Sequence, residues 1–130
     1  MNKQNAVEKF FSGIGGGNMD EILEAVHKDA VFEAQGPGTV PIYNTFHGKE
    51  GVTEFVRILG ELFDTEDFKV YVTAPHEDYI FAYGLMKHRV RATGKIFECE
   101  WALVCKIKEG KIISYKMFED TFALERAFKA

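Results

Sequence analysis

Two glycine-containing turns constrain this chain more than any other feature, because they divide its last third into three β-rich runs. The turns are Thr93-Gly94 and Lys108-Glu109-Gly110, and the runs cover residues 79–92, 95–107 and 111–120. Alternating runs of this length that meet at short glycine turns are typical of antiparallel strands. The sequence therefore predicts a three-stranded antiparallel meander.

The first turn also predicts a register. If Thr93 and Gly94 form a two-residue hairpin loop, Arg89 faces Glu98 on one side of the sheet and Met86 faces Trp101 on the other. Opposite charges then pair on the outer face and apolar groups pair on the inner face. A slip of one residue would mix the two faces, so this agreement favours the register.

A three-residue second loop, with Gly110 in the left-handed conformation, sets the register of the next hairpin. It places Cys99 opposite Glu119, and the first hairpin places Cys99 opposite His88. We therefore expect the inner face to carry one polar row, His88, Cys99 and Glu119, between apolar neighbours. A functional site is expected in that row.

Composition excludes several classes of function. A chain of 130 residues is predicted to form one domain over residues 1–130, and its 46% hydrophobic and 14% aromatic content predicts a large core or a lined cavity. The net charge of -4 carries no basic block, so no nucleic acid is expected as a partner. No apolar run approaches the roughly 20 residues that cross a bilayer, and the polar residues 1–5 are no signal peptide. We expect a cytoplasmic protein that does not bind a membrane.

The two cysteines, Cys99 and Cys105, lie on one predicted strand. Six residues of strand span roughly 20 Å, so they cannot form a disulfide with each other, and free thiols fit a reducing compartment. No Cys/His spacing typical of a metal site is present, and neither a metal nor a cofactor is expected.

Helical patterns precede the meander. The triple glycine at 15–17 follows one of them, which predicts a plain turn between helices and not a phosphate-binding loop. Apolar spacing predicts helices over 7–14, 19–26, 49–63 and 121–128, strands over 30–35 and 68–75, and an irregular segment over 35–44. Helices followed by a long antiparallel sheet predict an α+β fold, with the sheet curled into a cone around the three N-terminal helices.

A resemblance to a known superfamily rests on this order of elements and on four short segments. These are Val7-Glu8-Lys9-Phe10-Phe11, Asp29-Ala30-Val31-Phe32-Glu33, Gly48-Lys49-Glu50-Gly51-Val52 and Glu109-Gly110-Lys111-Ile112. With them the chain resembles, over nearly its whole length, the nuclear-transport-factor-2-like (NTF2-like) superfamily, in particular its ketosteroid isomerase and SnoaL-like polyketide cyclase branch. The resemblance implies the NTF2-like cone. It does not specify an activity, because one fold hosts isomerases, cyclases, dehydratases, epoxide hydrolases and proteins without chemistry.

The resemblance also implies that the isomerases' catalytic groups are absent. Their oxyanion tyrosine falls at Phe10, their general-base aspartate at Ala34 and their oxyanion acid near Leu103. None of these side chains exchanges a proton, which rejects isomerase chemistry by that machinery. The cyclase branch implies an acid at or near Met117; Met117 cannot serve, but Glu119 lies two residues on and on the same face.

Three residues are the catalytic candidates. Glu119 on an apolar inner face would be desolvated, which raises its pKa toward the range useful for acid/base work; the alternative is a strand-end side chain in water. His88 would orient Glu119 or shuttle a proton; the alternative is a core histidine with a backbone partner. Tyr115 would donate a hydrogen bond to a substrate carbonyl. The predicted substrate-binding residues are Trp101, Met86, Met117, Cys99, Phe55, Leu59 and Phe10 in the interior and Tyr43 at the entrance, and Cys99 is more typical of an inert thiol than of a nucleophile.

Two functions remain open at this point, beside a third in which the outer face of the sheet serves a protein-interaction module. The first is a cofactor-independent isomerase- or cyclase-like enzyme that moves a proton on a small, apolar, carbonyl-bearing substrate. The alternative is a dimeric ligand-binding protein that has kept the cone without the chemistry. The outer face of the meander is more apolar than a solvated face requires, which predicts a homodimer interface at Tyr79, Phe81, Tyr83, Leu85, Ala102 and Val104.

Overall fold

The computed structural model describes residues 3–129, so Met1 and Asn2 of the polar start and Ala130 lie outside the described residues. The helices are α1 (Lys3–Gly16), α2 (Met19–Glu24), α3 (Gly48–Leu62) and α4 (Thr121–Phe128). The strands are β1 (Val26–Ala34), β2 (Thr45–His47), β3 (Phe63–His76), β4 (Tyr79–Val90), β5 (Ile96–Lys108) and β6 (Lys111–Phe118). None of the helices in the described part of the chain has the length and apolar content needed to span a bilayer.

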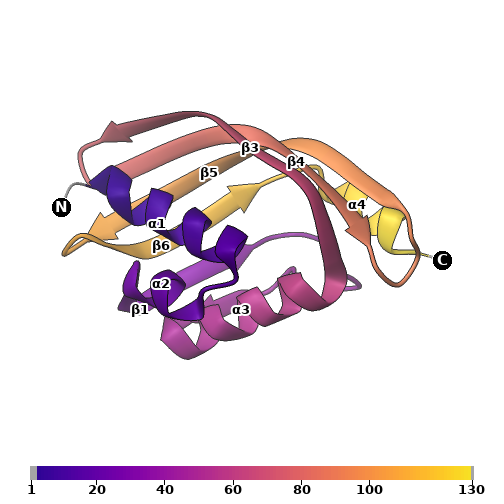
Figure 1. Ribbon diagram of the computed structural model, residues 1–130, viewed down its shortest axis with the longest axis horizontal. Coiled ribbons are helices and arrows are strands. Elements are labelled where there is room, and N and C mark those ends of the chain that lie inside the picture. Colours follow the sequence, from indigo (N-terminus) through magenta and orange to yellow (C-terminus); the bar gives the residue numbers. More distant parts are fainter. Residues whose placement is uncertain (1–2, 130) are drawn as a thin grey trace.

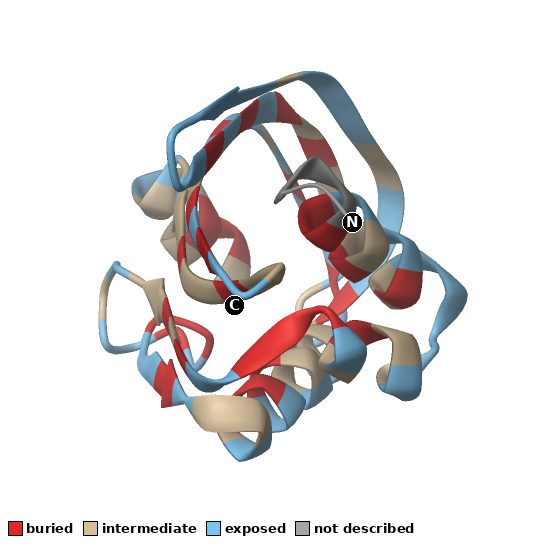
Figure 2. Cartoon of the chain, turned by 90° about the vertical axis from the view of Figure 1, so that its left-hand side faces the viewer, coloured by how far each residue is buried: buried red, intermediate tan, exposed pale blue. Residues whose placement is uncertain are grey.

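The six strands form one curved sheet in the order β2-β1-β6-β5-β4-β3. β1 pairs with β6 in parallel, and the other neighbours are antiparallel. The sheet arches over α1, and α2 and α3 lie below (Figure 1). Buried and exposed residues alternate along β4 and β5, so one face of these strands lines the core (Figure 2). This architecture confirms the predicted α+β class and the meander of β4, β5 and β6.

Helix boundaries follow local chemistry. Asn18 caps α2, because its side-chain oxygen accepts a hydrogen bond from the backbone N–H of Glu21 at 3.1 Å. The glycines at 15–17 end α1 and form the turn to α2, as predicted. α3 buries Val52 and Phe55 against the sheet. Asp120 caps α4 through a 3.0 Å bond from the backbone N–H of Ala123.

The predicted two-residue loop between β4 and β5 is wrong. The chain leaves the ladder at Val90 and rejoins it at Lys95, where the backbone N–H of Val90 donates to the carbonyl of Lys95 at 2.9 Å. Arg91 leaves the ladder because its backbone N–H bonds to the carbonyl of Leu62 at the end of α3. The loop therefore has four residues, and His88 faces Phe97 while Met86 faces Cys99. Every pair is displaced by two residues, which leaves each side chain on its predicted face.

The second loop also differs from its prediction. It has two residues, Glu109 and Gly110, both with positive φ (55° and 75°), as a type I′ hairpin turn requires. A bulge then skips Ile113, so that Cys105 faces Tyr115. The shorter loop and the bulge together displace the register by two residues. The inner and outer faces are again preserved.

Gly84 permits close contact between β4 and its surroundings. A Cβ atom there would lie 2.6 Å from Cζ2 of Trp101 and still closer to the carbonyl oxygen of Lys69 on β3. Real Cβ contacts are essentially never shorter than 3.0 Å. The absence of a side chain therefore lets the indole of Trp101 pack against the backbone, where it also stacks on Phe68 at 5.1 Å between ring centroids.

Candidate functional site

The three polar residues share the inner face but do not form a row, so this prediction is wrong. His88 is opposite Phe97, Cys99 is opposite Met86, and β6 ends one residue before Glu119. If the register of β6 is continued, Glu119 falls opposite Trp101. The three residues therefore lie on a diagonal, with steps of about 7–8 Å between neighbouring positions.

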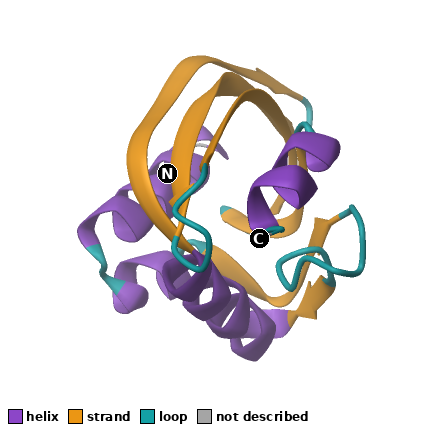
Figure 3. Ribbon diagram, turned by 90° about the vertical axis from the view of Figure 1, so that its right-hand side faces the viewer, coloured by secondary structure: helices purple, strands orange, loops and turns teal. Residues whose placement is uncertain are grey.

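Glu119 turns into the interior and meets Tyr43. The Tyr43 hydroxyl donates a hydrogen bond to Oε2 of Glu119 at 2.8 Å. Asp120 next to it faces the backbone of α4 as the helix cap, so the two adjacent carboxylates point in different directions. Figure 3 shows the side of the molecule on which α4 and the C-terminus lie. Burial raises the pKa of the Glu119 carboxyl, and the hydrogen bond from Tyr43 partly offsets that rise.

Tyr43 is supplied by the irregular segment between β1 and β2. It is only 9% exposed, and its pKa is raised by burial and by the neighbouring charge of Glu119. Tyr43 therefore stays protonated and acts as a hydrogen-bond donor. The sequence placed Tyr43 only at the entrance, and the pairing with Glu119 was missed because strand periodicity carries no information about a loop.

Cys99 lies beside this pair and is half-buried. Burial raises the pKa of its thiol, and a backbone hydrogen bond with Asp120 opposes that shift. The thiol is thus protonated at neutral pH, in contrast to the thiolates of nucleophilic cysteines. Cys99 is therefore an uncharged neighbour of Glu119 and not a nucleophile.

Tyr115 lies deeper on β6, inside an aromatic cluster. Its ring stacks on Phe32 with 4.4 Å between centroids and an interplanar angle of 4°. Its pKa is raised well above the usual value, mainly by burial. Tyr115 is 4% exposed, and no described residue accepts a hydrogen bond from its hydroxyl.

The predicted lining residues separate into two groups. Phe10, Phe55, Met86 and Trp101 are packed in the core, and the Trp101 indole nitrogen has no hydrogen-bond partner among the described residues. Leu59, Cys99 and Met117 keep partial exposure. Ala34 pairs with Met117 and is also partly exposed. Of these, Cys99 and Met117 lie near Glu119: the Glu119 charge contributes to the raised pKa of the Cys99 thiol, and Met117 precedes Glu119 by two residues.

His88 does not contact its predicted partner, Glu119, but interacts with Thr65 and Phe63. Its Nδ1 lies 3.0 Å from the Thr65 hydroxyl, and its ring stacks on Phe63 at 4.8 Å. Burial lowers the pKa of His88 to about 4, so the imidazole is neutral at neutral pH. The predicted interaction between His88 and Glu119 is not formed, because each has a separate partner on a different part of the fold.

The His88 environment predicts an acid-sensitive fold. The unfolded imidazole has a pKa near 6.5, so the folded state loses about 1.4 kcal/mol per pH unit as the pH falls from that value toward the folded pKa, or about 2 kcal/mol between pH 6.5 and pH 5. We expect His88→Phe to reduce this loss in urea unfolding measured across that range. His76→Gln, at an exposed histidine, is the control. Equal pH slopes for His88→Phe and wild type would contradict the assignment.

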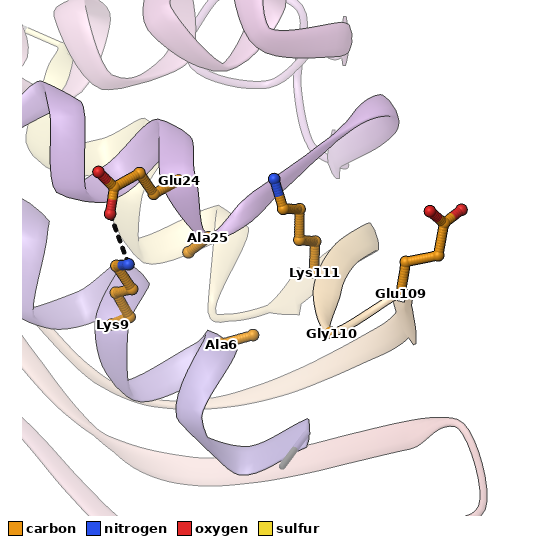
Figure 4. A pocket seen from close by; sticks show the side chains of 7 residues that line it. All are labelled: Ala6, Lys9, Glu24, Ala25, Glu109, Gly110 and Lys111. Atoms are coloured by element: carbon orange, nitrogen blue, oxygen red, sulfur yellow. Dashed lines mark hydrogen bonds and ion pairs between the residues drawn. The ribbon is translucent and has the colours of Figure 1, made fainter. Parts of the chain in front are cut away.

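A separate pocket of about 480 Å³ lies at the other end of β6. It is lined by Ala6, Lys9, Glu24, Ala25, Glu109, Gly110 and Lys111. Lys9 and Glu24 form a 2.6 Å ion pair across it (Figure 4). Below it, the buried His27 accepts from the backbone N–H of Asp29 at 3.0 Å and lies 3.3 Å from Glu109. Lys9 is thus paired with Glu24, and His27 with Asp29 and Glu109. The pocket contains none of the predicted site residues.

Comparison with known proteins matches residues 7–115 to the SnoaL-like domain model. Glu119 lies beyond the matched segment. No curated protein matches the chain significantly in sequence.

Solved structures extend the comparison to the fold. An NTF2-like protein from Burkholderia xenovorans is 22% identical, with a TM-score of 0.87 over 98% of this chain and 95% of that one. An NTF2-like protein from Burkholderia thailandensis is 22% identical, with a TM-score of 0.88 over 100% and 99% of the two chains. TerC, co-crystallised with polyporic acid, is 16% identical, with a TM-score of 0.86 over 98% of each chain. At these identities the similarity shows the fold alone.

Proposed function

This chain belongs to the SnoaL-like domain family, and from that premise we propose that it is a cofactor-independent enzyme of isomerase or cyclase type. Its substrate would be a small, apolar, carbonyl-bearing molecule bound inside the cone. Glu119 would transfer the proton. The observation that carries the proposal is the inward Glu119 carboxyl, with a raised pKa and a hydrogen bond from Tyr43.

Each residue has a chemical role in this proposal. Glu119 exchanges a proton with the carbon next to the carbonyl or with the carbonyl oxygen, since a raised pKa helps a carboxyl both to accept and to release a proton. Tyr43 replaces His88 as its hydrogen-bond partner. The hydroxyl of Tyr115 donates to the carbonyl oxygen, and Cys99, Met117 and Leu59 contact the apolar part of the substrate.

The proposal does not use the ketosteroid isomerase machinery. Phe10 and Leu103 are 0% and 1% exposed and belong to the core, and Ala34 offers only a methyl group. No proton can be transferred at these three positions. The proposed chemistry therefore depends on the C-terminal end of β6, where Glu119 lies.

A ligand screen with two readouts tests the proposal. Hydrophobic ketones, diketones and quinones are first tested for thermal stabilisation of the protein, because a ligand that binds only the folded state raises the unfolding temperature. Stabilising compounds are then tested for conversion, or for exchange of their acidic protons with deuterium from the solvent. Exchange or conversion supports the enzyme. Stabilisation without either supports the alternative, a ligand-binding protein without chemistry.

We also propose that the outer face of β3 and β4 forms a homodimer interface. Tyr79, Phe81 and Tyr83 of β4 are 38%, 41% and 41% exposed there. Tyr71 and Val72 of β3 are exposed beside them; Val72 is opposite Tyr83, and the Tyr71 and Tyr83 ring centroids are 5.4 Å apart. Contiguous apolar surface of this kind is typical of interaction sites.

We expect light scattering to show a dimer at micromolar concentration. Phe81→Lys should produce a monomer, because a charge in the centre of an apolar interface loses its hydration without gaining a partner. Phe122→Lys is the matched control, since Phe122 is an exposed aromatic residue on α4. A monomeric wild-type protein, or a dimer that survives Phe81→Lys, would contradict the interface.

A further inference from the structure

The segment that carries Tyr43 is a packed loop. It covers residues 35–44, and its ends are joined by the backbone hydrogen bond from Ala34 N–H to the carbonyl of Asn44 at 3.0 Å. Val40 and Ile42 within it are 1% and 4% exposed. Its outer part is tied to α4 by a 3.2 Å bond from the Thr39 hydroxyl to Glu125. A loop with close ends and buried side chains of its own holds its residues in fixed positions.

Gly36 lies directly against the Tyr43 ring. A Cβ atom at position 36 would be 2.6 Å from Cε2 and 2.7 Å from Cγ of Tyr43, with Cδ2 closer still. The obstacle is the face of an aromatic ring, which cannot move aside as the end of a flexible chain can. Gly38, two residues later in the same loop, offers a contrast, because a Cβ atom there would meet nothing within 4 Å.

The hydrogen bond to Glu119 depends on this contact. The distance from Tyr43 Oη to Glu119 Oε2 is 2.8 Å, and such a bond is lost when the atoms separate beyond about 3.5 Å. A methyl group at position 36 would push the ring by about an ångström to restore ordinary contact. Because the methyl group presses on the face of the ring, the hydroxyl moves out of line with Glu119, which lengthens and bends the bond.

We infer that Gly36 is a positioning residue of the site: by having no side chain, it holds the Tyr43 hydroxyl on Glu119. The inference rests on the proposed function for its catalytic meaning. The positioning of Tyr43 by Gly36 can be tested without a substrate, because the hydrogen bond from Tyr43 affects the pKa of Glu119. The three atoms nearest to a Cβ at position 36 all belong to the Tyr43 ring.

Carboxyl titration by carbon-detected NMR tests this inference without a ligand. Tyr43→Phe removes only the hydroxyl, so the pKa of Glu119 should rise, because burial is no longer offset by the donated hydrogen bond. Gly36→Ala should produce an upward shift of the same size, and Gly38→Ala none. An unchanged Glu119 titration in folded Gly36→Ala would overturn the inference, as would an equal shift in Gly38→Ala.

A double-mutant cycle covers the case in which Gly36→Ala destabilises the fold. If the cost comes from the Tyr43 ring, adding Tyr43→Ala relieves it, and Gly36→Ala in that background loses most of its effect on the unfolding temperature. Additive costs would overturn the inference. If the Glu119 titration shifts as expected but no screened compound is turned over, the positioning role stands and the proposed function fails.

Discussion

Replacing Glu119 by glutamine lowers turnover of a compound identified by the screen by about 10²–10⁴-fold, the usual contribution of a positioned acid or base. The amide has nearly the same shape and still accepts the hydrogen bond from Tyr43, but it exchanges no proton. Binding of the same compound, followed by thermal shift, should change little. Glu98→Gln removes a carboxylate from the exposed outer face and is the control. Retained turnover in Glu119→Gln would remove the basis of the proposed mechanism.

Glu119→Gln should also change the pH dependence of the free energy of unfolding, which can be measured without a substrate. The folded pKa of Glu119 is raised, so the folded state is favoured by protonation and gains stability as the pH falls through that pKa toward the unfolded value near 4.3. At higher pH the buried charge costs stability, and glutamine removes that cost. Glu119→Gln should therefore be more stable than wild type at pH 8, with an advantage that shrinks as the pH is lowered.

Gly84→Ala destabilises the protein by about 3 kcal/mol or more, at the upper end of the cost of overpacking a core. The added methyl group overlaps both the carbonyl oxygen of Lys69 and the indole of Trp101, so β3 and β4 must separate and Trp101 must shift on Phe68. The effect is not confined to position 84, because both the β3–β4 pairing and the stack of Trp101 on Phe68 depend on close approach to Gly84. Urea unfolding measures the effect.

The matched control is Gly60→Ala on the exposed side of α3. A Cβ atom there meets nothing within 4 Å. Alanine favours the helix, so this variant should gain up to about 1 kcal/mol. A cost for Gly84→Ala no larger than a few tenths of a kcal/mol would show that the strands adapt to the methyl group.

The sequence predicted the faces of the sheet correctly but not its register. Alternation of polar and apolar residues has a period of two, and both hairpins differ from their predicted registers by two residues. Such a displacement leaves every side chain on its own face, so the inward positions of His88, Cys99 and Glu119 were recovered. Their mutual distances were not, because those depend on loop lengths. Arg91 lengthened the first loop through a bond to Leu62, a residue far away in sequence.

The partner of Glu119 could not be predicted by the same reasoning. Tyr43 lies in a loop, where no period relates sequence to direction, and it reaches a residue 76 positions later. A signal was nevertheless present in the glycine at position 36, whose small size admits the Tyr43 ring. The role of Gly36 can be recognised only in the structure, where the pairing of β1 with β6 brings the Tyr43 loop close to Glu119.

The parallel pairing of β1 with β6 has a consequence for how the molecule is made. β1 leaves the ribosome long before β6, and until residues 111–118 emerge only its β2 edge can be paired. The late closure of this pair favours slow folding and leaves a strand edge open to aggregation during synthesis, since long-range strand pairing is slow. A ribosome-bound fragment that stops before residue 111 would therefore be expected to lack β6, which joins β1 and β2 to the rest of the sheet.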